Sequence, residues 1–177
     1  LVTNGGNDTV NAGTGNDSVD AGAGNDQITM RVDGSDTIDG GLGTDNLSLK
    51  LEDLSHWGIA RVWWQAKNAA GEALTAVDSS YSFADIDALV KTAAEFYLPV
   101  HGSYGGSNIA NVTFKGIENL SLEASTVTND NDLIFRRGTG NYDGKGGTDT
   151  LYADLSTAAA GIRFVAGIEI STQWRGQ

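Results

Sequence analysis

A nine-residue period occupies the N-terminal part of the chain and constrains its fold more than any other feature. The shared pattern is GGxGxDxUx, where U is a large aliphatic residue. A repeat of this regularity predicts one small structural unit per period, stacked on its neighbours into a coil. Five segments fit the pattern, the fourth after one inserted residue, Met30: TNGGNDTVN (3–11), AGTGNDSVD (12–20), AGAGNDQIT (21–29), RVDGSDTID (31–39) and GGLGTDNLS (40–48).

Each column of the repeat has a chemical reason. Glycine tolerates the positive φ of a tight turn and lets carbonyl groups converge on one point. Calcium prefers six to eight oxygen ligands and accepts carbonyls beside carboxylates. The xUx triplet is a minimal strand whose central side chain turns inward. The aspartate column is Asp8, Asp17, Asp26, Asp36 and Asp45, and the aliphatic column is Val10, Val19, Ile28, Ile38 and Leu47.

A turn and a strand from each nonapeptide predict that loops two repeats apart stack on each other. Paired strands lie ~4.8 Å apart, and two carboxylates at that spacing repel by roughly 3 kcal/mol at an effective dielectric near 20. A divalent cation between the two carboxylates turns this net repulsion into a net attraction. The conformational entropy lost when nine residues become ordered also costs more free energy than the burial of one aliphatic side chain contributes. We therefore expect the array to be disordered without calcium. A flexible linker would have no reason to keep an aliphatic residue two places after every aspartate.

These repeats resemble the repeats-in-toxin (RTX) family of secreted bacterial proteins. The resemblance implies a mainly all-β fold, a right-handed parallel β-roll or β-helix. It also implies that each calcium ion binds carbonyls two and four and the aspartate of one loop, and carbonyls one and three and the aspartate of the loop two repeats later. Three ligand sets follow: Asn4, Gly6, Asp8, Ala21, Ala23 and Asp26; Gly13, Gly15, Asp17, Arg31, Asp33 and Asp36; and Gly22, Gly24, Asp26, Gly40, Leu42 and Asp45.

The fourth repeat departs from the pattern, since Arg31 and Val32 stand where glycines belong and Met30 breaks the count. We expect Met30 to disturb the stack and the second ion site to be the least regular.

Composition narrows the class of partner. The net charge is −12 with only 11 Lys and Arg, which argues against nucleic acid and favours a cation. The chain has no cysteine and therefore no disulfide framework or thiolate metal site. No apolar run approaches the ~18 residues of a membrane span. Because the sequence begins inside a repeat, we expect it to be a fragment of a larger protein.

Downstream, parts of the module recur. GTDNLSLKLEDLS (43–55) resembles GTDTLYADLS (147–156), and each is followed by a Gly-Ile-Glu segment, 115–123 and 166–173, expected to resume the coil. Leu133, Tyr142 and Leu151 fall nine apart, as the aliphatic column does. One further calcium ion is a candidate here, and a metal-free coil turn is the equal alternative. Its ligands would be Asp130 or Asn131 with Gly144, Gly146 and Asp149.

The segment between the two repeat regions has a different composition. We expect a calcium-binding roll at 1–55, an inserted cap at 56–114 and a resumed roll at 115–177. Within the cap, 58–77 predicts a hairpin that turns at 68–71. Residues 82–97 predict a helix capped by Ser82 with Asp85 three places on. One face would carry Phe83, Ile86, Val90, Ala93 and Tyr97, with Pro99 after the end.

The cap also holds aromatic residues that offer a candidate surface for a glycan or a sister protein, namely Trp57, Trp63, Trp64 and Tyr104. Such residues are more often core or interface anchors. The two histidines, His56 and His101, show no ligand spacing, and neither HExxH nor GxSxG occurs. We therefore expect no catalytic residue here.

Three functions remain in order of preference. The first is a calcium-binding structural module of a larger secreted or cell-surface bacterial protein; its relatives leave the cell unfolded through a one-step (type I) channel and fold in extracellular calcium. The second is an adhesin or surface-layer module that binds through the aromatic insertion. The third is part of a calcium-dependent secreted enzyme whose catalytic domain lies outside this chain.

Overall fold

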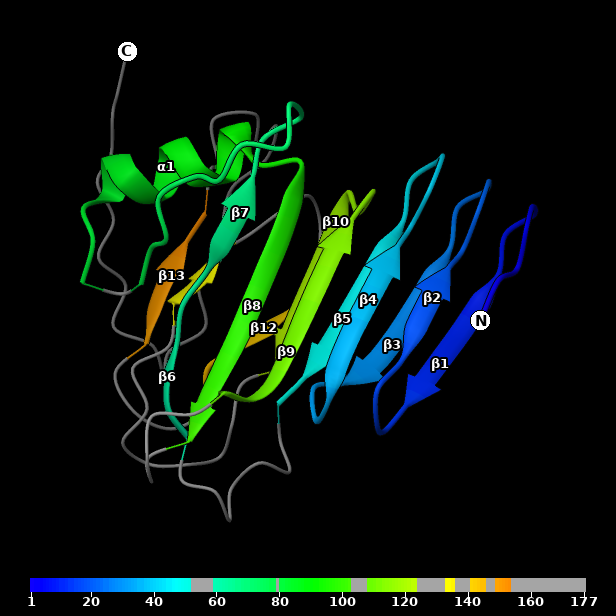
Figure 1. The fold of residues 1–177 in the computed structure, drawn as a ribbon, viewed down its shortest axis with the longest axis horizontal. Coiled ribbons are helices and arrows are strands. Elements are labelled where there is room, and N and C mark those ends of the chain that lie inside the picture. Colours follow the sequence, from blue (N-terminus) through cyan, green and yellow to red (C-terminus); the bar gives the residue numbers. More distant parts are fainter. Residues whose placement is uncertain are drawn as a thin grey trace, which may run out of the picture.

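The computed structural model describes residues 1–51, 59–78, 80–102, 108–123, 133–135, 141–145 and 149–153. This part of the chain is mainly β, as expected, with one helix (Figure 1). The elements in chain order are β1 (Thr9–Gly13), β2 (Ser18–Asp20), β3 (Gln27–Arg31), β4 (Ser35–Asp39), β5 (Asn46–Lys50), β6 (Ile59–Val62), β7 (Gln65–Lys67), α1 (Phe83–Thr92), β8 (Glu95–Gly102), β9 (Asn108–Lys115), β10 (Asn119–Glu123), β11 (Leu133–Phe135), β12 (Tyr142–Asp143) and β13 (Thr150–Tyr152).

Successive repeat strands alternate between two sheets, so each strand pairs with the strand two repeats away (Figure 1). One sheet has the order β1-β3-β5-β10-β12 and every pair in it is parallel. The other begins β2-β4-β9, also parallel, and continues through the antiparallel strands β8 and β6. The predicted stacking of every second repeat is confirmed.

The aliphatic column forms the core between the sheets. Val10, Val19, Ile28, Ile38 and Leu47 are at most 3% exposed. In the first sheet Val10 pairs with Ile28, and Ile28 pairs with Leu47. Because side chains alternate along a strand, the polar residues beside them turn outward. One inward side chain per repeat is enough because the stack makes the core continuous.

Met30 breaks the nine-residue count, as expected, and β1 has a register shift opposite it, but the pairing of β3 with β5 is not interrupted. Met30 lies inside β3, is 1% exposed and pairs with Leu49 of β5. The extra residue lengthens β3, and β1 follows this extension across a bulge at Ala12, since Asn11 pairs with Thr29 but Gly13 pairs with Met30. The strands therefore lengthen and gain a second inward side chain. Arg31 pairs with Lys50 at the end of β3, so it is a strand residue and not the first residue of a loop.

The insertion extends the second sheet. The turn at 68–71 forms as predicted, with Gly71 N–H donating to the Asn68 carbonyl at 2.9 Å, and β7 pairs antiparallel with β8. Ser82 caps α1 and accepts from Asp85 N–H, also as predicted. The helix ends at Thr92, however, and Tyr97 and Pro99 lie in β8. Phe96, Leu98 and Val100 are buried at alternate positions, and this period of two outweighs helix formation there.

The first Gly-Ile-Glu segment resumes the parallel coil as predicted. Leu120 of β10 pairs with Leu47, and β10 also pairs with β12. The second Gly-Ile-Glu segment lies outside the described residues. Near the C-terminus, β11 and β13 pair in parallel with Ile134, not Leu133, opposite Leu151. The expected column is therefore shifted by one residue there, and Tyr152 is buried in place of Leu151.

Candidate calcium-binding site

The aspartate column forms two ladders, one at each edge of the stacked repeats. The backbone N–H of Asp8 donates to Oδ1 of Asp26 at 2.7 Å, and that of Asp26 donates to Oδ1 of Asp45 at 2.8 Å. On the opposite edge, Asp17 N–H donates to Oδ1 of Asp36 at 2.9 Å. The three aspartate pairs expected from the sequence are thus brought together.

The second oxygen of each aspartate is buried without a hydrogen-bond donor among the described residues. The five atoms are Oδ2 of Asp8, Asp17, Asp26, Asp36 and Asp45. A buried, unpartnered carboxylate oxygen is strongly disfavoured unless a cation compensates it. Five such atoms at the same repeat position indicate a shared ligand.

The same burial disfavours charge on the carboxylates. Asp36 is 1% exposed, and burial, reinforced by the charges of Asp17 and Asp33, raises its pKa to about 6. Burial likewise raises the pKa of Asp45, with added repulsion from Asp26, Glu118 and Asp39. A divalent cation is the ligand that relieves both burial and repulsion.

Backbone conformation directs carbonyls into the same region. Residues at positions two and four have positive φ in four of the five repeats, namely Asn4, Gly6, Gly13, Gly15, Gly22, Gly24, Gly41 and Gly43. Glycine is required where loops touch, because a Cβ on Gly24 would lie 1.9 Å from the Gly6 carbonyl oxygen. The positive-φ turns thus bring carbonyl oxygens of one loop against the glycines of the next stacked loop, and calcium accepts such carbonyls as ligands.

Direct hydrogen bonds also join the loops two repeats apart. Ala23 N–H donates to the Asn4 carbonyl at 2.9 Å, and Leu42 N–H donates to the Gly22 carbonyl at 2.8 Å. Gly6 N–H in turn donates to the Ala23 carbonyl at 2.7 Å. A carbonyl oxygen has two lone pairs, so each acceptor keeps one for a cation. In the first and third predicted ligand sets, aspartates and carbonyls lie on facing loops.

The second predicted ligand set is only partly assembled. Asp33 Oδ1 accepts from Gly15 N–H at 2.9 Å, and a Cβ on Gly34 would lie 2.2 Å from the Gly15 carbonyl oxygen. Arg31, by contrast, is paired within β3 and is separated from this turn by Val32, which is buried. The fourth loop is therefore shorter than the others.

Asparagines add a second ladder that the sequence analysis did not assign. Oδ1 of Asn7, Asn16 and Asn25 accepts from the N–H of Asn25, Ser35 and Thr44, respectively. The recurring Gly-Asn-Asp sequence was the feature from which this asparagine ladder could have been predicted. Asparagine one place before the aspartate supplies a side-chain acceptor to the next stacked loop.

Glu118 was also missed. Its Oε2 accepts from Asp45 N–H at 2.9 Å, which is the bond that an aspartate Oδ1 makes in every earlier rung. The signal was the match between Asp45-Asn-Leu-Ser and Glu118-Asn-Leu-Ser.

At the C-terminal candidate, Gly144 and Asp149 lie together, since a Cβ on Gly144 would meet Asp149 Oδ2 at 2.4 Å. Gly40 and Asp45 have the same relation in the fifth repeat. Lys145 occupies the intervening turn with φ 59° and forms ion pairs with Glu123 at 2.6 Å and Asp143 at 3.0 Å. Gly146, Asp130 and Asn131 lie outside the described residues.

Trp64 was expected on an exposed aromatic surface of the insertion, and this prediction is wrong. Its side chain is fully buried, packs edge-on against Phe96 and Phe114 with ring centroids 6.3 and 6.1 Å away, and donates from Nε1 to the Leu133 carbonyl at 2.7 Å. Trp63 is half-buried. Trp57 and Tyr104 lie outside the described residues.

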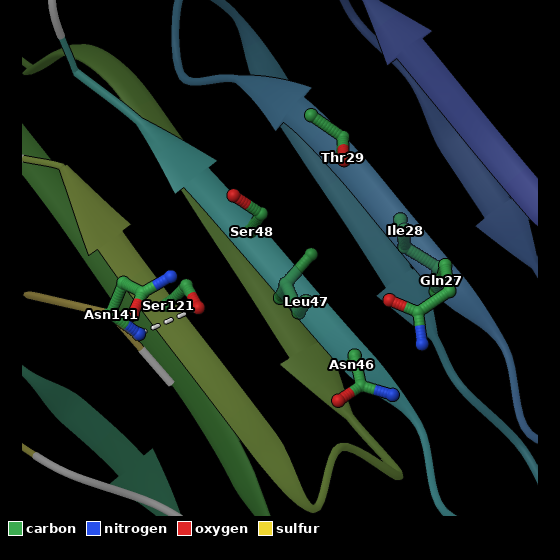
Figure 2. A pocket seen from close by; sticks show the side chains of 8 residues that line it. All are labelled: Gln27, Ile28, Thr29, Asn46, Leu47, Ser48, Ser121 and Asn141. Atoms are coloured by element: carbon green, nitrogen blue, oxygen red, sulfur yellow. Dashed lines mark hydrogen bonds between the residues drawn. The ribbon is translucent and has the colours of Figure 1, made fainter. Parts of the chain in front are cut away.

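A groove on the outer face of β3, β5 and β10 carries no catalytic set. Figure 2 shows that its projecting polar groups are amides and hydroxyls, such as Gln27, Asn46 and Ser48. Within the described ranges, no three His, Cys, Asp or Glu side chains gather around one point. Any cation in the ladders therefore needs carbonyls as well as its two carboxylates.

No helix in this part of the chain is long and apolar enough to cross a membrane.

Comparison with known families agrees with this geometry. The RTX calcium-binding nonapeptide repeat matches residues 1–29 and 33–49 in four copies. This N-terminal part is thus an RTX repeat array, and its repeats are calcium-binding. The interruption at 30–32 coincides with the strand extension through Met30. No curated protein and no solved structure matches the chain.

Proposed function

We propose that this chain is a calcium-dependent structural module of a larger secreted or cell-surface bacterial protein, which folds when it meets extracellular calcium. The observation that carries the proposal is the row of five buried aspartate oxygens without a donor. Calcium would be held by the aspartate pairs and by carbonyls at positions one to four of facing loops, in about three sites in the N-terminal array. Bound calcium would supply positive charge that lets the carboxylates remain ionised and close together.

The proposed architecture is a right-handed parallel β-roll with an inserted α+β segment. Its parts are the roll at 1–55, the cap at 56–114 and the resumed roll at 115–177. The support is the alternation of parallel strands between two sheets and the return of the chain through β9 and β10. An adhesive role for the insertion has less support, because Trp64 belongs to the core.

Circular dichroism in calcium-free buffer and in ~5 mM calcium, within the range that extracellular modules sense, tests the proposal. We expect a coil-like spectrum without calcium and a β spectrum with it. Magnesium at the same concentration is the matched control, because it demands a tighter octahedral site and gives up its water reluctantly. A full β spectrum in calcium-free buffer would contradict calcium-dependent folding.

A further inference from the structure

The aspartate ladder continues into the turn that follows the insertion. Asp8, Asp26 and Asp45 are linked by N–H to Oδ1 bonds, and Asp45 N–H then donates to Glu118 Oε2 across 73 residues of sequence. Asn119 N–H donates back to the Asp45 carbonyl at 2.9 Å. The Gly116-Ile117-Glu118 turn thus occupies the place of the next nonapeptide loop.

Asp45 supplies an independent sign of a ligand at this place. It is fully buried, its Oδ1 is engaged by Asp26 N–H, and its Oδ2 has no donor among the described residues. A Cβ on Gly40 would lie 2.0 Å from the Gly116 carbonyl oxygen and 3.0 Å from Asp45 Oδ2. Both oxygens therefore face the space beside Gly40.

The turns on either side have the conformation of the other loops. Gly41 and Gly43 have φ of 91° and 143°, close to 88° and 145° at Gly22 and Gly24. The Gly41 carbonyl oxygen would lie 3.2 Å from a Cβ on Gly116, so it faces the Gly-Ile-Glu turn. Carboxylates and carbonyls from two chain segments thus surround one edge of the ladder.

Lys115 does not neutralise this cluster. Its ammonium group pairs with Asp39 at 2.8 Å, and Asp39 belongs to β4 at the base of the loop. Among the described residues, no Lys or Arg side chain forms an ion pair with Asp45 or Glu118, and Asp45 Oδ2 has no donor.

We infer that Asp45 and Glu118 form an additional calcium site, completed by the carbonyls of Gly41, Gly43 and Gly116. This inference rests on calcium binding by the repeats, as proposed above. Its consequence is that the ion joins the fifth repeat to the strand that returns from the insertion. Calcium would then hold β9 and β10 on the repeat stack as well as order the stack itself.

The test is a calcium count on the whole chain by isothermal titration and native mass spectrometry, with calcium alone as the probe. Glu118→Gln keeps a hydrogen-bond acceptor for Asp45 N–H but removes the charge. We expect it to bind one ion fewer than wild type, or to bind one ion at least tenfold more weakly. Glu72→Gln is the matched control, since Glu72 is an exposed residue directly after the 68–71 turn and its replacement should leave the count unchanged.

Equal counts and affinities for wild type and Glu118→Gln would overturn the inference and leave Glu118 as a hydrogen-bonding cap. Absence of calcium binding by wild type would instead overturn the proposed function. Counts are compared on protein that circular dichroism shows to be folded at saturating calcium. Should Glu118→Gln not fold, Glu118→Asp replaces it. The inference then expects the ion to remain with altered affinity, and unchanged affinity at every site contradicts it.

Discussion

Asp26 is the residue at which the calcium ladder can be tested most sharply. It is fully buried and lies between Asp8 and Asp45, with a hydrogen bond to each. In the proposed wiring it serves two ions, whereas Asp17 is hydrogen-bonded to one aspartate, Asp36, and serves one. Asp26→Asn keeps the size of the side chain and an acceptor for Asp8 N–H, so it removes charge and little else.

Asp26→Asn is expected to stabilise the fold when calcium is absent and to weaken calcium binding when it is present. At the ~4.8 Å spacing of paired strands, each neighbouring carboxylate pair repels by about 3 kcal/mol at an effective dielectric of 20. Without calcium, Asp26→Asn removes two such repulsions and should favour the folded state. With calcium, it removes a charged ligand from two ions. An interaction with a charged group is worth ~1.5–3 kcal/mol, so binding should weaken roughly 10- to 150-fold at each of two sites.

Isothermal titration of Asp26→Asn, Asp17→Asn and wild type measures the calcium affinities. The far-ultraviolet circular dichroism spectrum in calcium-free buffer measures how much of each protein is folded without calcium. Two weakened sites for Asp26→Asn against one for Asp17→Asn are expected. Equal losses in the two variants would refute the pairing of loops two repeats apart. A calcium-free Asp26→Asn protein less ordered than wild type would refute the electrostatic reasoning.

Two further predictions concern charge and close contact. The pKa of Asp36 rises to about 6 in the fold, so the calcium-free fold loses stability as pH rises from about 4 to 6, by about 3 kcal/mol at ~1.4 kcal/mol per unit. The β signal in calcium-free buffer should therefore be greater at pH 4.5 than at pH 7, and Asp36→Asn should flatten that difference; an unchanged difference in the variant would assign it to other groups. Gly24→Ala places a Cβ 1.9 Å from the Gly6 carbonyl oxygen, whereas Gly15→Ala meets nothing within 4 Å although both residues have positive φ. The thermal midpoint in calcium should fall further for Gly24→Ala, and equal falls would mean that backbone strain alone matters.

The period of nine was sufficient to predict the parts of the fold that repeat. It gave the stacking of every second repeat and the buried aliphatic column, because both follow from one turn and one inward side chain per period. At Met30 the count alone marked an irregularity but could not tell a defect in the stack from a longer strand. The pairing of Met30 with Leu49 decides that question, and this pairing is a tertiary contact.

The insertion illustrates a different limit. The helix start was predictable because Ser82 and Asp85 act locally, but its end at Thr92 was not. Residues from Glu95 onward satisfy a strand, which gains its stability from pairing with β9. Trp64 likewise read as a surface candidate, since the sequence does not show that Phe96, Phe114 and the Leu133 carbonyl converge on it.

The two edges of the roll are unequal, and this inequality bears on how calcium acts. One edge carries Asp8, Asp26, Asp45 and then Glu118, whereas the aspartate column of the other edge has only Asp17 and Asp36, with Asp33 on the same loop as Asp36. In the proposed wiring, an interior member of the longer ladder would be shared by two sites, so binding at one site would order a ligand of the next. Beyond Asp36 the second edge offers no carboxylate among the described residues, because Asn111 N–H meets the Gly34 carbonyl and the Asn111 amide meets Ser35. Cooperative calcium binding should therefore belong to the edge that includes Glu118, and the insertion should be ordered from that edge.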